Sequence, residues 1–168
     1  MDITKLDKLY SELLTFFQGN SGQIQHFAKV HSFAALIGRQ EGLSEKEQFT
    51  LEAAALTHDV GIRPAMEKFG RCNGKLQEQE GPPVVQEMLA ALDFPRDVTE
   101  RVAYLVGHHH TYTDIDGIDY QILVEADFLV NLFEGGSSKE QIQITEENIF
   151  RTKSGKEILR RMFLPETL

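Results

Sequence analysis

Apolar residues recur every three to four positions along most of the chain, which is the period of an amphipathic helix. In the first segment, Ile3, Leu6, Leu9, Leu13 and Phe17 follow this spacing. The same period returns in segments that begin near residues 21, 44, 82, 98, 118 and 140. Alternation of apolar and polar positions, which would indicate strands, never lasts beyond a few residues. The pattern therefore predicts an all-α fold, a helical bundle.

Residues that begin or end helices sharpen this prediction. Ser44 to Glu47 form a capping box for a helix that ends at His58-Asp59. Residues 61–79 are punctuated by glycine and proline, so we expect an irregular loop there, long enough to be functional. Pro82-Pro83 fits the first turn of the following helix.

The chain has the length of one domain with a sizeable core, at 168 residues. It contains no internal repeat, low-complexity tract or interdomain linker. We therefore predict a single domain over residues 1–168. The motif-bearing core covers about 22–134, and further helices follow in residues 138–168.

Polar residues with metal-binding side chains interrupt three of the apolar segments. His58 and Asp59 are adjacent at the end of an alanine-rich run, and His26 lies on a helix with an apolar face. Asp127 stands within a strongly apolar segment, where a carboxylate is costly to bury unless a cation or hydrogen-bond donors balance it. A structural ion pair with arginine is the alternative. Imidazole and carboxylate groups on three elements are what a divalent metal requires.

The order and context of these residues resemble the HD superfamily of metal-dependent phosphohydrolases. The signature of that family is a histidine, an adjacent His-Asp pair and a distant aspartate. Three segments carry the resemblance, within about residues 24–133: Ile24–Val30, Ala53–Gly61 and Leu123–Leu129.

The resemblance implies a bundle of the HD-domain type in which His26, His58, Asp59 and Asp127 bind metal. It also implies that Asp59 can bridge two ions. His31 competes with His26 for the first position, but the motif alignment favours His26. Mixed histidine and carboxylate ligands suit Fe, Mn, Zn, Co or Ni better than Mg, so we expect one or two divalent transition-metal ions.

A triple histidine at 108–110 is the second informative feature. Many HD proteins with two metals carry an extra histidine in this region. Counting back from Asp127, His109 fits best, His108 is next, and His110 is the weakest candidate. The alternative is a polar helix end, which histidines suit because positive charge is favoured at a helix C-terminus.

The chain departs from the two-metal pattern at Glu80-Gly81, where that branch of the family usually carries a histidine before a glycine. Glu80 could be an oxygen ligand, could hold a water on the metal, or could stabilise a helix dipole. Asp59 or Glu80 could accept a proton from the attacking water. Arg63 and Lys75 are the nearest candidates for binding a phosphate, ahead of Arg71, and solvated loop charge is the alternative for all three.

Composition limits the partners. The net charge of −9 makes duplex nucleic acid an unfavourable partner, whereas a small phosphorylated substrate is compatible with bound cations. The single cysteine excludes an intrachain disulfide, and no signal peptide or membrane-length apolar run is visible, so we expect a cytoplasmic protein without a membrane partner. The apolar segment at 158–163 could close the core or pair with a second copy, which would give a homodimer.

The sequence is compatible with three functions. The first is an enzyme, a metal-dependent phosphohydrolase that cleaves a small phosphorylated metabolite or nucleotide with metal-activated water. The second is an HD-type di-iron oxygenase, because the same scaffold and ligands can support oxygen chemistry. The third is a non-catalytic, metal-stabilised ligand-binding module.

Overall fold

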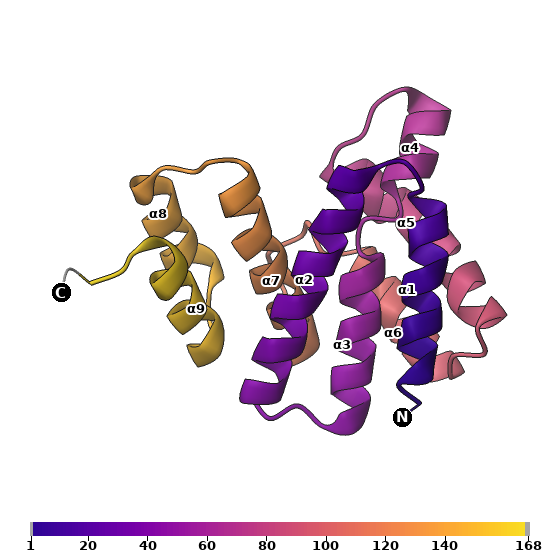
Figure 1. Ribbon diagram of the computed structural model, residues 1–168, viewed down its shortest axis with the longest axis horizontal. Helices are drawn as coiled ribbons and strands as arrows, with labels where there is room; N and C mark the ends of the chain where they lie inside the picture. Colours follow the sequence, from indigo (N-terminus) through magenta and orange to yellow (C-terminus); the bar gives the residue numbers. More distant parts are fainter. Residues whose placement is uncertain (1, 167–168) are drawn as a thin grey trace.

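The computed structural model describes residues 2–166, and its only regular elements there are α-helices (Figure 1). The prediction of an all-α fold is confirmed. In chain order the helices are α1 (Thr4–Phe16), α2 (Ser21–Gln40), α3 (Glu45–Thr57), α4 (Ile62–Phe69), α5 (Gly74–Ala91), α6 (Arg96–Val106), α7 (Ile118–Glu134), α8 (Lys139–Ile149) and α9 (Lys153–Phe163).

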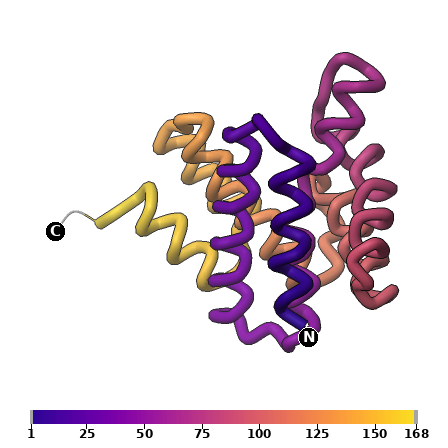
Figure 2. Tube along the Cα trace, turned by 45° about the vertical axis from the view of Figure 1, so that its right-hand side comes forward, coloured from indigo at the N-terminus to yellow at the C-terminus, as the bar shows by residue number. Residues whose placement is uncertain are grey.

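Helices α2 and α3 form a hairpin at the centre of the bundle (Figure 1). Helix α7 packs against both of them, α6 covers α3, and α5 packs on α6. Helix α1 lies on α3, while α8 and α9 lie on the other side of the bundle against α7 and α2 (Figure 2). The elements that carry the predicted metal ligands are therefore direct neighbours.

Most residues of helix α3 are buried, and the helix ends inside the molecule. The predicted capping box is present, with the Ser44 side chain accepting from the Glu47 backbone and the Glu47 side chain accepting from Ser44. Three consecutive alanines, 53–55, are fully buried. Their small side chains let neighbouring helices approach closely, and His58 follows as the C-terminal cap residue in the middle of the bundle.

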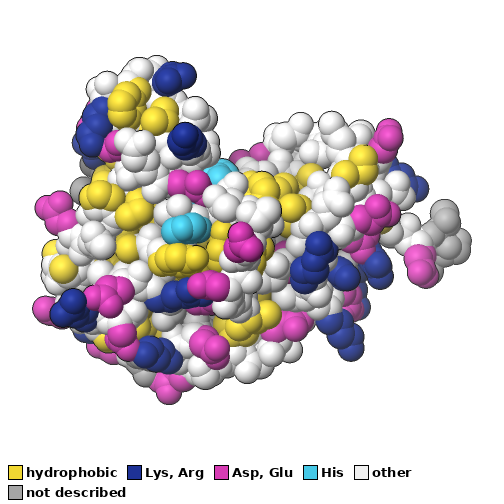
Figure 3. Space-filling view, turned by 180° about the vertical axis from the view of Figure 1, so that it is seen from behind, with side chains coloured by type: hydrophobic (Ala, Val, Ile, Leu, Met, Phe, Trp, Pro, Cys, Tyr) yellow, Lys and Arg dark blue, Asp and Glu magenta, His cyan; other side chains and the backbone are white. Residues whose placement is uncertain are grey.

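The prediction of an irregular loop over residues 61–79 is wrong. This stretch contains α4 and the first turns of α5, joined by a short turn. Gly70 ends α4 with φ of 64°, a left-handed conformation that favours glycine. Asn73 then begins α5 by accepting a hydrogen bond from the Leu76 backbone. The glycine and asparagine that suggested a loop are caps of two helices, and α4 forms a projecting lobe (Figure 3).

Helix α5 also continues through Pro82 and Pro83 instead of starting there. Its backbone packs closely on the end of α3, because a Cβ on Gly61 would lie 2.4 Å from the Gln77 carbonyl oxygen. A Cβ on Gly81 would lie 2.6 Å from Cγ1 of Val106. Two glycines therefore let α5 pass beside Asp59, and this contact positions Gln77 next to the predicted site.

The C-terminal helices contribute to the same apolar core, through Ile142, Phe150 and Leu159. The Glu125 carboxylate on α7 accepts hydrogen bonds from the backbone and hydroxyl of Thr152, the residue that caps α9. The apolar side of 158–163 thus closes the core, while the homodimer and the single-domain boundary stay predictions. No helix in residues 2–166 combines the length and hydropathy of a membrane span.

Candidate metal centre

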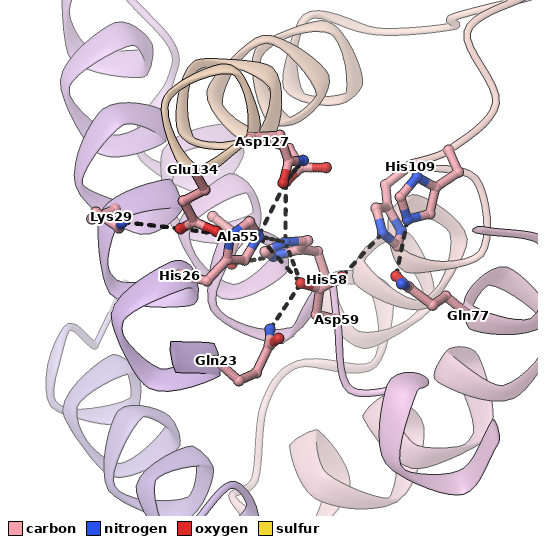
Figure 4. A network of polar contacts seen from close by, with 12 residues as sticks. Gln23, His26, Lys29, Ala55, His58, Asp59, Gln77, His109, Asp127 and Glu134 are labelled. Carbon is pink, nitrogen blue, oxygen red and sulfur yellow. Dashed lines mark hydrogen bonds and ion pairs between the residues drawn. The ribbon is translucent and has the colours of Figure 1, made fainter. Parts of the chain in front are cut away.

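Four of the predicted ligands converge at one point in the bundle (Figure 4). Nε2 of His26 lies 3.2 Å from Nε2 of His58, from Oδ2 of Asp59 and from Oδ1 of Asp127. Nε2 of His58 lies 3.2 Å from Oδ2 of Asp59 and 3.5 Å from Oδ1 of Asp127. All four residues are buried. Side chains from α2, the end of α3 and α7 therefore direct two nitrogens and two oxygens at a common centre.

The orientation of the rings makes Nε2, the nitrogen that faces the centre, available to a cation when the ring is neutral. Nδ1 of His58 donates to the Ala55 carbonyl at 2.8 Å, and Nδ1 of His26 donates to the Glu134 carboxylate at 3.2 Å. In a neutral imidazole this fixes the proton on Nδ1 and leaves a lone pair on Nε2. Metal-binding histidines in proteins are usually held in this way.

A second group of ligand atoms lies on the other side of Asp59. One ligand atom each from Asp59, His109 and His110 lie within 4.8 Å of one another. His109 follows α6 and donates from Nδ1 to the Val106 carbonyl at 2.8 Å. Its Nε2 is buried without a hydrogen-bond partner, 3.6 Å from Oδ1 of Asp59. The two oxygens of Asp59 thus face two different sets of histidines.

Charge in the cluster is strongly coupled. Burial by itself would lower the pKa of His26, but its hydrogen bonds with Asp127 and Asp59 outweigh burial and raise it to about 9. The pKa of His58 is also raised, because Asp59 and Asp127 overcome full burial. The pKa values of both aspartates are lowered by the neighbouring histidines in spite of burial. Two buried carboxylates therefore require positive charge beside them.

A divalent cation fits this requirement. It would supply the positive charge, and the Nε2 lone pairs of His26, His58 and His109 already point inward. The buried Nε2 of His109, which has no partner in the described residues, is the clearest sign of a missing ligand. The donor set of imidazole and carboxylate suits a transition-metal ion.

An outer layer of polar side chains holds the aspartates and His26 (Figure 4). The Gln23 amide donates to Oδ2 of Asp59 at 2.8 Å, and the Asn131 amide donates to Oδ1 of Asp127 at 2.9 Å. Glu134 accepts from His26 and also from Lys29, whose Nζ lies 2.9 Å away. Each of these contacts fixes the direction of a side chain in the cluster.

The cluster opens into a pocket of about 400 Å³. Among residues 2–166, Ile62 is the only apolar side chain in its wall. The remaining lining residues are Asn20, Gly22, Gln23, His26, Asp59, Gln77, His110, Asp127, Asn131 and Glu134. A small polar molecule that enters this pocket would reach both sets of histidines.

The triple histidine divides between three environments. His109 is fully buried in the second group, and His110 lines the pocket. His108 faces the other way: its ring stacks on Tyr104 with centroids 4.0 Å apart, and its Nδ1 donates to the Tyr104 carbonyl. The structure therefore places His109 and His110 at the site, in contrast to the expected order of His109 and His108. The turn after α6 explains this, because successive residues there point in different directions.

His31 does not reach the cluster. Its Nε2 lies 3.0 Å from the Glu52 carboxylate on α3, and its ring contacts Tyr10. Five residues separate it from His26, so on a helix the two side chains do not share a line. The choice of His26 over His31 agrees with this arrangement.

The site candidates predicted within residues 61–80 lie outside the pocket wall, namely Arg63, Arg71, Lys75 and Glu80. Glu80 is held in an ion pair with Lys68 of α4, which lowers its pKa. Arg63 pairs with Glu67 and donates to the Phe16 carbonyl. Arg71 and Lys75 are exposed. The structure therefore gives no support to a ligand role for Glu80 or to phosphate contacts from Arg63 and Lys75.

Gln77 is the residue of α5 that reaches the pocket. Its Oε1 lies 2.9 Å from Nε2 of His110, and it lines the pocket. Gln77 is four residues before Gly81, so it lies one turn earlier on the helix. On α5 the side chain at the pocket is therefore Gln77 and not Glu80, the residue beside Gly81.

Gln23, Asn131 and Glu134 are not among the site residues predicted from the sequence. A signal was present, because Gln23 precedes His26 by three residues, and Asn131 and Glu134 follow Asp127 by four and seven. Such spacings place side chains on one face of a helix. Polar residues on the same helix face as a predicted ligand therefore indicate side chains that support the site.

Comparison with known proteins agrees with this site. The model of the HD domain family matches residues 24–151, and the chain belongs to that family. The solved structure of a predicted HD superfamily hydrolase from an uncultured Thermotogales bacterium has a similar fold. Its TM-score is 0.68 at 19% sequence identity, with 96% of this chain and 90% of that chain covered. No curated protein shows significant similarity to the chain.

Proposed function

We propose that this protein is a metal-dependent phosphohydrolase that acts on a small phosphorylated metabolite or nucleotide. Membership of the HD domain family and the hydrolase name of the structural neighbour support a metal-dependent hydrolase. The observation that carries the proposal is the position of Asp59, whose two carboxylate oxygens face two histidine groups beside an open polar pocket.

The residues of the chain have separate tasks in this proposal. On one side of Asp59, a metal ion would be bound by His26, His58 and Asp127. On the other side, it would be bound by His109 and His110. When bound by these residues, a divalent ion would supply polarisation of a phosphoryl oxygen and a water of lowered pKa.

The surroundings keep these groups in place. Gln23 and Asn131 hold the two aspartates as charged acceptors, which keeps their oxygens available to a cation. The apolar core behind His58 and His109 keeps water away from their rings, both of which are fully buried. The pocket then exposes only one side of the cluster to a substrate.

Phosphate release after metal loading tests the proposal. The purified protein is analysed for its metal content, loaded with the matched metal or with Mn²⁺, and assayed on a panel of phosphate esters and anhydrides. We expect release of inorganic phosphate, and we expect Asp59→Ala to abolish it.

A matched control is Asp97→Ala, which removes an exposed aspartate that pairs with Lys46 far from the pocket. It should retain activity. Oxygen-dependent loss of an organic substrate without phosphate release would instead indicate a di-iron oxygenase. Tight metal binding with neither activity would indicate a ligand-binding module, and either result would contradict the proposal.

A further inference from the structure

The wall of the pocket contains acids and carboxamides but no lysine or arginine side chain, within residues 2–166. The acids are Asp59, Asp127 and Glu134. Enzymes that act on polyphosphates usually hold the additional phosphates with cationic side chains or metal ions. This pocket offers no such side chain, so its charge balance limits what it can bind.

Three cationic side chains of α2 and α4, the helices that carry His26 and Ile62 of the wall, are paired with acids, whereas Arg71 and Lys75 are exposed. Lys29 binds Glu134, Lys68 binds Glu80, and Arg63 binds Glu67. The three acids of the wall and Lys29 beside Glu134 together give the pocket a net charge of −2. One bound divalent ion would raise this net charge to 0, and two would raise it to +2. A phosphomonoester carries about −1.5 to −2 at pH 7. A diphosphate or triphosphate carries more negative charge than this site offsets.

In each carboxamide of the wall, the oxygen or the nitrogen makes a hydrogen bond within the protein, and the other group can bind a ligand. The amide nitrogens of Gln23 and Asn131 hold the aspartates, so their oxygens remain as acceptors. The oxygens of Asn20 and Gln77 are used by the Gln23 backbone and by His110. The Asn20 nitrogen therefore remains as a donor, and the Gln77 nitrogen, which also donates to the Cys72 thiol, keeps one of its two N–H groups. Hydroxyl groups both donate and accept, and they match such a mixed set.

The size and polarity of the pocket also favour a small, polar ligand. A volume of about 400 Å³ lies at the lower end of the range for small-molecule sites. Ile62, the one apolar lining residue in the described part of the chain, offers little surface for an aryl or acyl group. The preferred ligand is therefore small, polar and only moderately charged.

We propose that the pocket selects small phosphomonoesters whose organic part carries hydroxyl groups, such as a sugar, polyol or nucleoside, over nucleoside polyphosphates and aryl phosphates. This selectivity rests on the proposed phosphohydrolase function. The phosphate group faces the metal centre, and the free ends of the four carboxamides bind the hydroxyl groups.

The test compares ribose 5-phosphate, adenosine monophosphate, adenosine triphosphate and phenyl phosphate as substrates of the metal-loaded protein. We expect kcat/KM for the better of the two hydroxyl-bearing monoesters to exceed the values for the triphosphate and for phenyl phosphate by at least about tenfold. A preference for the triphosphate or for phenyl phosphate would overturn the inference while leaving the phosphohydrolase function intact. Failure to release phosphate from any of them would contradict the proposed function itself.

Equilibrium binding gives a readout that does not depend on turnover. Calorimetry with the phosphonate analogues of adenosine monophosphate and triphosphate should show tighter binding of the monophosphate analogue to the metal-loaded protein. Equal or tighter binding of the triphosphate analogue would contradict the charge argument.

Two variants separate the charge argument from the hydroxyl argument. Ile62→Lys adds a cation to the wall and should shift kcat/KM towards the triphosphate by about tenfold, whereas Ile62→Met should not. Asn20→Ser keeps a side chain that caps α2 but removes the free amide donor, so KM for the hydroxyl-bearing monoesters should rise while metal content stays the same. An unchanged ratio in Ile62→Lys, or an unchanged KM in Asn20→Ser, would overturn the corresponding part of the inference.

Discussion

The four histidines of the candidate centre fall into two pairs that are held in different ways. His58 and His109 are fully buried, and each donates from Nδ1 to a backbone carbonyl three residues earlier. His26 and His110 line the pocket and are held by side chains, Glu134 and Gln77. The first pair is part of the helical framework, and the second pair depends on residues that can change without altering the fold.

This difference teaches which part of the site is structural and which is adjustable. A backbone carbonyl cannot be removed by substitution, so the direction of the His58 and His109 rings follows from the fold alone. The contacts of His26 and His110 instead tune affinity, as outer-layer partners of metal ligands commonly do. The two pairs should therefore respond differently to mutation.

The largest effect is expected for the framework pair. His58→Ala removes a fully buried ring, opens a cavity and leaves Asp59 and Asp127 with one partner fewer. We expect loss of bound metal and a decrease of about 3 kcal/mol in the free energy of unfolding. Elemental analysis and denaturant unfolding measure both quantities.

The matched control for that change is His108→Ala, which removes a histidine that stacks on Tyr104 outside the cluster. It should keep full metal content. Equal metal loss in the two variants would remove the distinction between framework histidines and the others.

A smaller effect is expected when the support of His26 is removed. Glu134→Ala deletes the carboxylate that accepts from Nδ1 of His26. We expect metal affinity to fall by about 10- to 100-fold. The free energy of unfolding should change by less than about 0.5 kcal/mol, because the Glu134 side chain is partly exposed. Metal titration measures the affinity, and chemical unfolding measures the free energy of unfolding. The control is Glu87→Ala, which removes an exposed glutamate.

The pH dependence of stability in the metal-free protein sharpens the comparison, because the pKa values of His26 and His110 are shifted in opposite directions. The pKa of His26 is raised to about 9, so its contribution is present below about 6.5 and is lost as the pH rises through about 9. Burial and His109 lower the pKa of His110 to about 4, so its contribution is present above about 6.5 and is lost as the pH falls towards 4.

Stability of the metal-free protein should therefore be greatest near pH 6.5 and fall on either side, by on the order of 1–2 kcal/mol for each histidine. Thermal unfolding across pH 4.5 to 9.5 measures this profile. Bound metal replaces the proton on His26 and should remove the alkaline decrease. A metal-free protein that gains stability between pH 7 and 9 would contradict the assigned contacts of His26.

The smallest effect is expected at the support of His110. Gln77→Ala removes one hydrogen bond to that ring, so we expect about fivefold weaker binding of an ion at the Asp59, His109 and His110 group. Binding at the His26 side should be unaffected. A metal titration that resolves two affinities would show this, and an equal weakening of both would mean that Gln77 supports the whole centre.

Much of this arrangement could be predicted from the sequence because helical period and motif order are local signals. The capping box at Ser44 fixed the start of α3, and the His58-Asp59 pair marked its end. His26 and Asp127 were recognised because a family signature records which segments meet in space. The all-α fold followed from the period of apolar positions.

The remaining details depend on directions that spacing alone does not give. The turn after α6 decides that His110 and not His108 faces the pocket, and the contact between Gly61 and α5 decides that Gln77 and not Glu80 lies there. The glycine and asparagine at 70 and 73 predict a loop, but in the structure they cap α4 and α5. In each case, tertiary packing selected among alternatives that the sequence left open.

The central claim is that His26, His58, Asp59 and Asp127 form one metal centre. Metal content per chain, measured by elemental analysis after equilibration with Mn²⁺ and removal of free ions, tests it most directly. The account predicts that the unmodified protein retains one or two ions per chain and that His26→Ala and Asp127→Ala each retain markedly less, while His108→Ala retains the full amount. Full metal content in both His26→Ala and Asp127→Ala would contradict it.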